Sequence, residues 1–245
     1  MEYPLEQLPT IGVVIPAYNE AKNILSVLNA VCAAEWIQKI ILVNDGSTDE
    51  TFEVAQCAAE RDERLVVIHL PENQGKAGAM LAGVQALHTD LVIFLDADLV
   101  GLKPQHLNQL ANPEKFRSNE MTIAVFRVGR ILTNVSQRMV PHLSGQRCLW
   151  REAAEQALIP LAADRYGVET GLTIYARSHH WKIRKIVWRG VTHHLVWQKH
   201  RGIAGLQNRW QMYSQIMTVI ARTRYVSKGR NPRSRPARKT RLTLW

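Results

Sequence analysis

Two aspartates at the end of an apolar run, Asp96 and Asp98, are the residues of this sequence that point most directly to chemistry. They follow Leu91-Val-Ile-Phe-Leu95, a run typical of a buried strand. Side chains alternate across a strand, so the two carboxylates are expected to share one face while Ala97 points away. Adjacent carboxylates repel each other unless a cation lies between them, and a divalent metal carrying a phosphorylated ligand meets that need. The alternative is a pair of solvated loop acids, which an isolated Asp-x-Asp would favour.

The segments before these aspartates predict a parallel sheet that would position them. Apolar runs alternate with stretches of helical spacing, the pattern of right-handed βαβ units, which bind ligands at the carboxyl ends of their strands. Pro16 is expected to end the first strand, and Ser47 or Thr48 to cap the second helix. The expected strands cover residues 11–15, 40–43, 65–68 and 91–95, and the expected helices residues 21–34, about 49–61, and 75–88.

The pattern is looser beyond Asp98. Residues 130–145 show no firm period, whereas residues 203–224 predict an amphipathic helix, and the Pro- and Arg-rich stretch 227–241 is expected to be mobile. Further helices are expected at residues 103–111, 151–161 and 169–178, and further strands at 121–128 and 182–188.

Composition indicates a globular protein whose charge is unevenly distributed. The chain has 245 residues, 46% of them hydrophobic, and lacks an apolar run of 18 residues or a signal-like N-terminus, so we expect a cytoplasmic protein. Its three cysteines have neither metal-ligand spacing nor a disulfide framework. Residues 1–169 hold 14 Lys/Arg against 21 Asp/Glu, whereas residues 170–245 hold 17 Lys/Arg and no acid. This asymmetry favours an anionic partner for the second part: lipid headgroups, a phosphorylated acceptor or nucleic acid.

Four polar motifs in order resemble the signature of nucleotide-sugar glycosyltransferases of family 2 with a GT-A fold. They are Val13-Val-Ile-Pro-Ala-Tyr-Asn-Glu20, Val43-Asn-Asp-Gly-Ser-Thr-Asp49, Asn73-Gln-Gly-Lys-Ala-Gly78 and Asp96-Ala-Asp98. Later blocks resemble polyprenyl- or dolichyl-phosphate sugar transferases and glucosyl-3-phosphoglycerate synthase: Leu143-Ser-Gly-Gln-Arg147, Tyr166-Gly-Val-Glu-Thr-Gly171 and Gly190-Val-Thr-His-His194. The resemblance implies an α/β fold with a mostly parallel, Rossmann-like sheet flanked by helices.

The resemblance also implies a nucleotide-sugar site and a metal. A lysine and backbone amides at a helix start suit a diphosphate, and Mg²⁺ or Mn²⁺ suits oxygen ligands. Asp98 would contact the ion, Asp96 would lie near the ribose or the ion's waters, and His194 would match the metal-binding histidine of the phosphoglycerate-type synthases, with His193 only a neighbour. The nucleotide-sugar-binding residues would be Pro16, Ala17, Tyr18, Glu20, Asp45, Ser47, Gly75, Lys76, Asp96 and Ala97.

Asp98 and Glu169 are the expected catalytic residues. In inverting relatives a carboxylate at the position of Glu169 acts as general base on the acceptor or orients its phosphate. In a retaining reaction Glu169 would position the sugar, and a purely structural acid at a helix N-terminus is a further alternative. By the same resemblance a phosphorylated acceptor would contact Gly129, Arg130, Thr133, Ser144 and Arg147.

The expected function is metal-dependent transfer of a hexose from a UDP- or GDP-sugar to a phosphorylated acceptor. Polyprenyl phosphate is preferred, because an acid-free second part with an amphipathic helix would bind an anionic membrane surface peripherally. The alternatives are a small hydroxy acid such as 3-phosphoglycerate and, from another class, a non-catalytic sugar-nucleotide sensor that binds nucleic acid. The expected parts are a catalytic domain (1–200) with nucleotide-binding (1–100) and acceptor (101–200) halves, an amphipathic helical extension (201–226) and a basic flexible tail (227–245).

Overall fold

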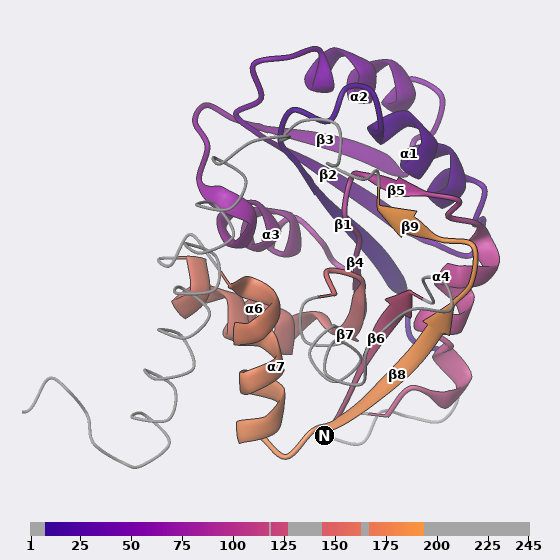
Figure 1. Ribbon diagram of the computed structural model, residues 1–245, viewed down its shortest axis with the longest axis vertical. Helices are drawn as coiled ribbons and strands as arrows, with labels where there is room; N and C mark the ends of the chain where they lie inside the picture. Colours follow the sequence, from indigo (N-terminus) through magenta and orange to yellow (C-terminus); the bar gives the residue numbers. More distant parts are fainter. Residues whose placement is uncertain (1–7, 118, 127–143, 163–166, 194–245) are drawn as a thin grey trace, which may run out of the picture.

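The computed structural model describes residues 8–117, 119–126, 144–162 and 167–193. Their centre is a seven-stranded sheet with the strand order β3-β2-β1-β4-β7-β6-β8 (Figure 1). β1 to β4 are parallel, β7 is antiparallel to both of its neighbours, and β8 is parallel to β6. The strands are β1 (Ile11–Ala17), β2 (Lys39–Asp45), β3 (Leu65–Leu70), β4 (Leu91–Phe94), β6 (Glu120–Phe126), β7 (Arg147–Trp150) and β8 (Lys182–Trp188).

Helices cover both faces of this sheet and make a three-layer α/β sandwich (Figure 1). One face carries α1 (Ile24–Cys32), α2 (Thr51–Ala59), α4 (Pro104–Leu110) and the short 3₁₀ helix η1 (Pro113–Lys115). The other face carries α3 (Gly75–Gln85), α6 (Arg151–Ala162) and α7 (Val168–Ser178). The predicted mostly parallel α/β fold is therefore confirmed.

The central strands are continuous apolar runs because both of their faces are buried. In β1 the side chains of Val13 and Ile15 belong to the core under α1, whereas Val14 belongs to the core under α3. All three are fully buried. The alternation of side chains thus joins two hydrophobic cores through one strand.

Pro16 lies inside β1 rather than ending it, which corrects the expected boundary. It pairs with Val43 of β2, while the pairing of β1 with β4 stops at Val14, which lies opposite Phe94. Backbone groups of residues two apart in a strand point to the same side, so those of Pro16 point, like those of Val14, towards β4. Proline has no N–H to donate, but β4 has already ended at this level and offers no partner there. The strand therefore continues to Ala17 without losing a ladder hydrogen bond to β4.

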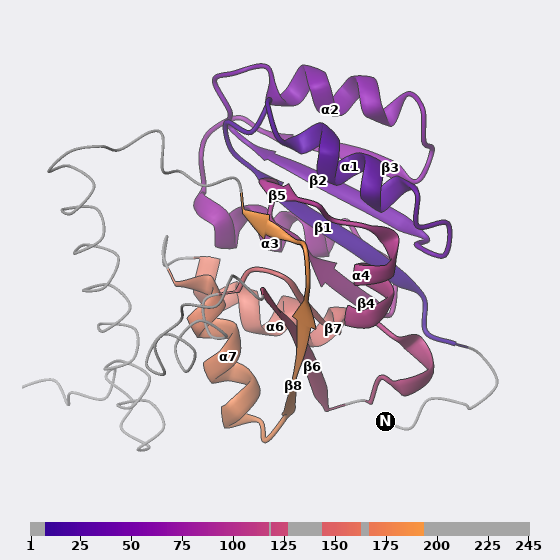
Figure 2. The same cartoon turned by 45° about the vertical axis from the view of Figure 1, so that its right-hand side comes forward.

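The predicted helix cap in the second motif is wrong. α2 begins at Thr51 with Glu50 at the N-cap position, two residues or more beyond Ser47 and Thr48. Two pairings were also not predicted: β7 within the sheet, and the two-stranded antiparallel sheet of β5 (Leu99–Val100) with β9 (Thr192–His193), which Figure 2 shows in front of β1.

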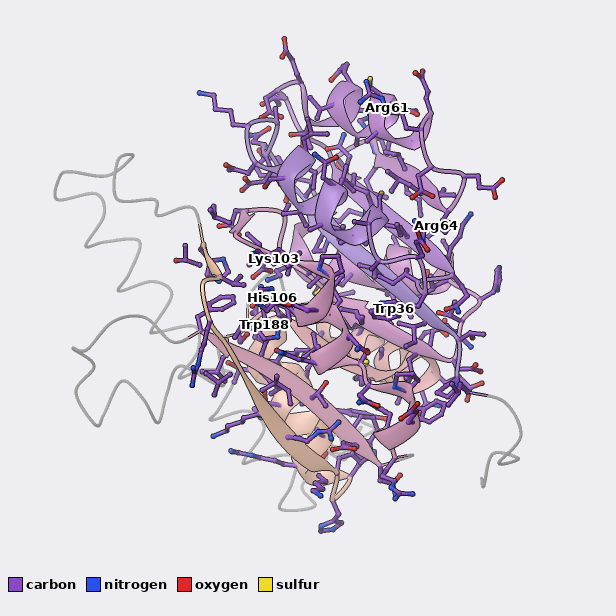
Figure 3. The ribbon with its side chains drawn as sticks, turned by 90° about the vertical axis from the view of Figure 1, so that its right-hand side faces the viewer. Trp36, Arg61, Arg64, Lys103, His106 and Trp188 are labelled. Carbon is purple, nitrogen blue, oxygen red and sulfur yellow. The ribbon has the colours of Figure 1, made fainter. Side chains whose placement is uncertain are left out.

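The far edge of the sheet is fixed by aromatic packing between α4 and β8. Figure 3 shows His106 of α4 beside Trp188 at the end of β8, with ring centroids 5.4 Å apart. Trp188 is fully buried, and Gly190, at a φ of 75°, turns the chain from β8 towards β9. After this turn, β9 pairs with β5.

The predicted helical extension over 201–226 and the predicted basic tail over 227–245 lie outside the described residues. Among the helices that the structure describes, none is both long and apolar enough to cross a membrane.

Candidate active site

A pocket of about 540 Å³ lies at the carboxyl ends of the parallel strands. The ends of β1 and β2, the loops after β1, β3 and β4, the start of α3 and the strand β9 all contribute to it, so segments far apart in the sequence meet there. This is the edge at which open parallel sheets bind their ligands. The lining residues are Pro16, Ala17, Tyr18, Glu20, Asp45, Asn73, Gly75, Lys76, Asp96, Ala97, Asp98 and His193.

Asp96, Asp98 and His193 form a cluster in which one potential ligand atom from each side chain lies within 4.8 Å of the others. Nδ1 of His193 is 2.9 Å from Oδ1 of Asp98, and its Nε2 is 3.9 Å from Oδ2 of Asp96. The hydrogen bond to Asp98 raises the pKa of His193, although partial burial of the ring opposes this. Two carboxylates and one imidazole are a ligand set suited to a divalent cation such as Mn²⁺ or Mg²⁺.

The pairing of β5 with β9 brings His193 to the aspartates. Leu99, the residue after Asp98, lies opposite His193 in this two-stranded sheet. β4 itself ends at Phe94, so both aspartates lie in the turn that follows the strand rather than on one of its faces. The turn places both carboxylates in the pocket.

Lys76, in the first turn of α3, lies between two carboxylates. Its Nζ is 2.6 Å from Oδ1 of Asp96 and 2.6 Å from Oε1 of Glu169 in α7. Burial would lower the pKa of the ammonium, but the two carboxylates outweigh it and the pKa is raised. Burial would likewise raise the pKa of Asp96, yet Lys76 holds it below its ordinary value. Lys76 and Asp96 are therefore both charged at neutral pH.

Hydrogen bonds link the loops around Asp45 at one end of the pocket. Asp45 is buried, and its Oδ1 accepts the backbone N–H of Gln74 at 2.7 Å, which joins the end of β2 to the start of α3. Ser47 does not line the pocket; its Oγ accepts the N–H of Asn19 at 3.0 Å. Asn19, with a φ of 56°, accepts the N–H of Thr48 in return. Ser47 thus holds two pocket loops together.

The structure brings most of the expected nucleotide-sugar residues into one pocket. Apart from Ser47, each of the ten has atoms on the pocket wall. Glu169 reaches the same place through its ion pair with Lys76.

The expected acceptor residues are placed differently. Arg147 is fully buried, with Nε donating to the carbonyl of Ser144 and a terminal N–H to Oγ1 of Thr173 in α7. Burial lowers the pKa of Arg147 to about 10, opposed by Glu169 and Asp96. Ser144 is buried as well. Neither residue lines the pocket, and the contact of Arg147 and Ser144 with an acceptor phosphate stays a prediction. Gly129, Arg130, Thr133 and His194 lie outside the described residues.

Three residues near the aspartates were not predicted to act there. His193 was expected to be only a neighbour of His194, and Asn73 and Gln146 were quoted within motifs without a role. Gln146 donates a hydrogen bond to Asp96, and Asn73 lines the pocket. Their presence in motif blocks was the available signal, but only the strand pairings show which of them face the carboxylates.

Comparison with protein families decides the class of this chain. Residues 12–184 match the model of the glycosyl transferase family 2. The chain belongs to this family. The match covers the sheet from β1 into β8, and with it Asp96, Asp98 and Glu169, so the family assigned from the four motifs is confirmed.

Individual relatives are more distant. An undecaprenyl-phosphate 4-deoxy-4-formamido-L-arabinose transferase of Yersinia pestis (strain Pestoides F) is 29% identical over 179 residues, which are 71% of this chain and 54% of that protein. A Yersinia enterocolitica enzyme of the same name is 28% identical over 179 residues, with the same coverage. The chain thus spans about half the length of these curated relatives.

Solved structures support the GT-A fold. Glucosyl-3-phosphoglycerate synthase from Mycobacterium tuberculosis, in complex with Mn²⁺, uridine diphosphate and phosphoglyceric acid, has a TM-score of 0.68 at 24% identity, covering 88% of this chain and 78% of that chain. The same enzyme with Mg²⁺ and uridine diphosphate has a TM-score of 0.66 at 24% identity, covering 92% of this chain and 81% of that one.

Proposed function

We propose that this chain is a metal-dependent glycosyltransferase that moves a hexose from a nucleoside diphosphate sugar to a phosphorylated acceptor. The observation that carries the proposal is the placement of Lys76 beside the cluster of Asp96, Asp98 and His193 in one pocket. A cation at a helix start beside a set of metal ligands suits a diphosphate that carries its own metal ion. Membership of glycosyl transferase family 2 supports the same activity.

The donor set of the cluster fits a divalent ion. Asp98 and His193 would hold it directly, with Asp96 as a further ligand or as an acceptor from its bound waters. Such an ion, when bound, stabilises the negative charge that develops on a departing diphosphate. The ligand chemistry is compatible with both Mn²⁺ and Mg²⁺, and the solved relatives contain one or the other.

The remaining residues of the pocket would orient the donor. Asp45 retains a second carboxylate oxygen besides the one bound to Gln74, and this oxygen suits an N–H of a base or a ribose hydroxyl. Tyr18, about half exposed, offers a ring against which a base can pack. Gly75 and Lys76 would contact the diphosphate, as the sequence predicts.

Glu169 would act on the acceptor. Its carboxylate is ion-paired with Lys76, so a diphosphate that engages Lys76 would compete for the same ammonium. A carboxylate released from that pair is a stronger proton acceptor, which suits a general base for an acceptor hydroxyl or phosphate in an inverting reaction. In a retaining reaction the same group would position the sugar.

Polyprenyl phosphate is the acceptor we favour. The Yersinia relatives are named as undecaprenyl-phosphate transferases, and the acid-free stretch from residue 170 onward suits an anionic membrane surface. A peripheral position on the cytoplasmic face of a membrane is part of this proposal. A small hydroxy acid such as 3-phosphoglycerate is the second candidate, because a structural relative was solved with phosphoglyceric acid.

A product screen tests the proposal. UDP- and GDP-hexoses are incubated with Mn²⁺ and either polyprenyl phosphate or small phosphorylated acids, and the anomeric configuration of the product is read by NMR. We expect transfer that needs the metal and Asp98, and the Asp98→Ala variant should stay folded but inactive. Nucleotide-sugar binding without transfer to any acceptor would favour the sensor function instead.

A further inference from the structure

The side chain of Gln146 is buried against the carboxylate of Asp96. It has no exposed surface, and its Nε2 donates to Oδ2 of Asp96 at 2.6 Å. The ionised carboxylate of Asp96 can only accept hydrogen bonds, so the NH₂ end of the amide must face it, while Oε1 lies 3.0 Å from the hydroxyl of Ser144. Gln146 directly precedes β7, so it is held by the antiparallel pairing of β7 with β4 and β6.

The residue before it, Gly145, lies against the same carboxylate. A Cβ atom at this position would be 2.3 Å from Oδ1 and 2.4 Å from Oδ2 of Asp96, closer than any real contact. Asp96 is thus seated on the backbone of Gly145 and hydrogen-bonded by the side chain of Gln146. Two consecutive residues fix one carboxylate.

The two carboxylate oxygens of Asp96 have different partners. Oδ1 is engaged by Lys76, whereas Oδ2 accepts from Gln146 and lies 3.9 Å from Nε2 of His193. A carboxylate oxygen has two lone pairs, so Oδ2 can accept from Gln146 and still bind a cation held together with His193. The amide of Gln146 is neutral, so it orients the carboxylate and leaves its charge unchanged. A lysine or arginine at that place would instead offset the charge.

We propose that Gln146 is a positioning residue of the candidate metal site, which acts by holding Asp96 in the rotamer that faces Asp98 and His193. The inference rests on the proposed metal-dependent function. Partners that orient a ligand in this way contribute roughly 10- to 100-fold to metal affinity. A purely structural role would instead give Gln146 an effect on stability alone, since it satisfies a largely buried carboxylate.

The test compares Mn²⁺ binding, measured by electron paramagnetic resonance in the presence of UDP, in wild type and Gln146→Met. Methionine keeps the length of the side chain and removes the amide. We expect the Kd for Mn²⁺ to rise by roughly 10- to 100-fold, the KM for Mn²⁺ to rise in parallel, and kcat at saturating Mn²⁺ to change much less.

A matched control is Thr122→Val. Thr122 is fully buried on β6, beside β7, and its hydroxyl donates to the carbonyl of Leu110, away from Asp96. This variant loses a buried hydrogen bond of the same sheet, so we expect lower thermal stability with an unchanged Kd for Mn²⁺. Should Gln146→Met fail to fold, Gln146→Asn, one methylene shorter, serves in its place.

The outcomes separate this inference from the function on which it rests. If wild type and a folded variant at position 146 bind Mn²⁺ in the presence of UDP with the same affinity, the role of Gln146 is overturned and the proposed function stands. An equal loss of affinity in Thr122→Val also overturns it, because the effect would then follow general destabilisation. Wild type that binds no Mn²⁺ overturns the metal-dependent function itself.

Discussion

At the scale of single residues, the structure and the family resemblance favour different histidines as the metal ligand. The resemblance implies His194 as a metal ligand, whereas the structure places the ring of His193 beside Asp98 and Asp96. His194 lies outside the described residues, so on the geometry of the cluster His193 is the expected ligand.

Separate alanine substitutions decide between the two histidines. We expect His193→Ala to weaken Mn²⁺ binding by at least about tenfold, because a ligand of the cluster is lost, and His194→Ala to have a much smaller effect. Isothermal titration of Mn²⁺ into each variant with saturating UDP measures this. A larger loss in His194→Ala would show that β9 is shifted by one residue when the metal is bound.

Glu169 should affect turnover more than donor binding. In Glu169→Gln the shape of the side chain is kept while its basicity is lost, so we expect kcat to fall by roughly 10²- to 10⁴-fold, the contribution of a general base, with little change in the KM for the donor. Steady-state kinetics with the acceptor found in the product screen provide the measurement.

A matched control for this variant is Glu155→Gln on α6, which breaks the ion pair of Glu155 with Arg151. We expect its kinetics to equal those of wild type. If Glu169→Gln retains full turnover, Glu169 is not the base, and a retaining reaction or a purely structural acid becomes the better account.

Residues close together in sequence were predicted more fully than residues joined by strand pairing. Asp96, Asp98 and Lys76 lie at the ends of elements whose order follows from local patterns. His193 enters the site through two residues of β9, and Gln146 through the four-residue strand β7. Strands this short carry no periodicity, so their place can be read only from pairing with distant segments.

At the scale of elements, the βαβ half of the fold was predicted well because β1, β2 and β4 are buried on both faces and therefore read as continuous apolar runs. Its four strands and three helices are all present, with ends that coincide with the expected ones or differ from them by up to three residues. The second half mixes strand directions. β7 runs antiparallel between β4 and β6, and such an insertion leaves no mark in the local pattern of apolar residues.

Arg64 joins three elements of the first half: the end of α1, the start of β2 and the start of β3 (Figure 3). Its guanidinium donates to the carbonyls of Cys32, Ala34 and Ile37. Asp62 holds the guanidinium through both carboxylate oxygens, at 3.0 and 2.7 Å. The contact with Arg64 lowers the pKa of Asp62 to about 2.

Asp62→Asn should therefore destabilise the fold in a pH-dependent way. The folded pKa of Asp62 is depressed, so its contribution is complete above the unfolded pKa of about 3.9 and is lost as the pH falls through about 2. We expect the variant to be less stable by about 1 kcal/mol at pH 7, and the difference from wild type to shrink between about pH 4 and pH 2. Urea unfolding across this range measures it.

Glu63→Gln, at the exposed neighbouring position, is the control for this effect. It removes one acidic group without touching the carbonyls bound by Arg64. A constant difference between wild type and Asp62→Asn down to pH 2 would show that Asp62 acts through packing rather than charge.

At the scale of the whole molecule, the distribution of charge is the feature that the described structure explains least. The acidic first part holds the two aspartates of the proposed metal site, whereas the last 76 residues carry 17 Lys/Arg and no acid. Seven of these basic residues follow Tyr225. The sequence predicts their interaction with anions from charge alone, since that interaction needs no fixed conformation.

Removal of residues 226–245 tests this interaction. Each basic residue near an anionic leaflet contributes about 1 kcal/mol, and 1.4 kcal/mol is a factor of ten in affinity. If even two of the seven reach the surface, binding to vesicles rich in anionic lipid at low salt should weaken by at least about tenfold. Vesicle sedimentation measures the change, with zwitterionic vesicles and high salt as controls, in which both proteins should bind weakly. Undiminished binding by the truncated chain would place the membrane contact before residue 226, and absent binding by wild type would favour the small phosphorylated acid as acceptor.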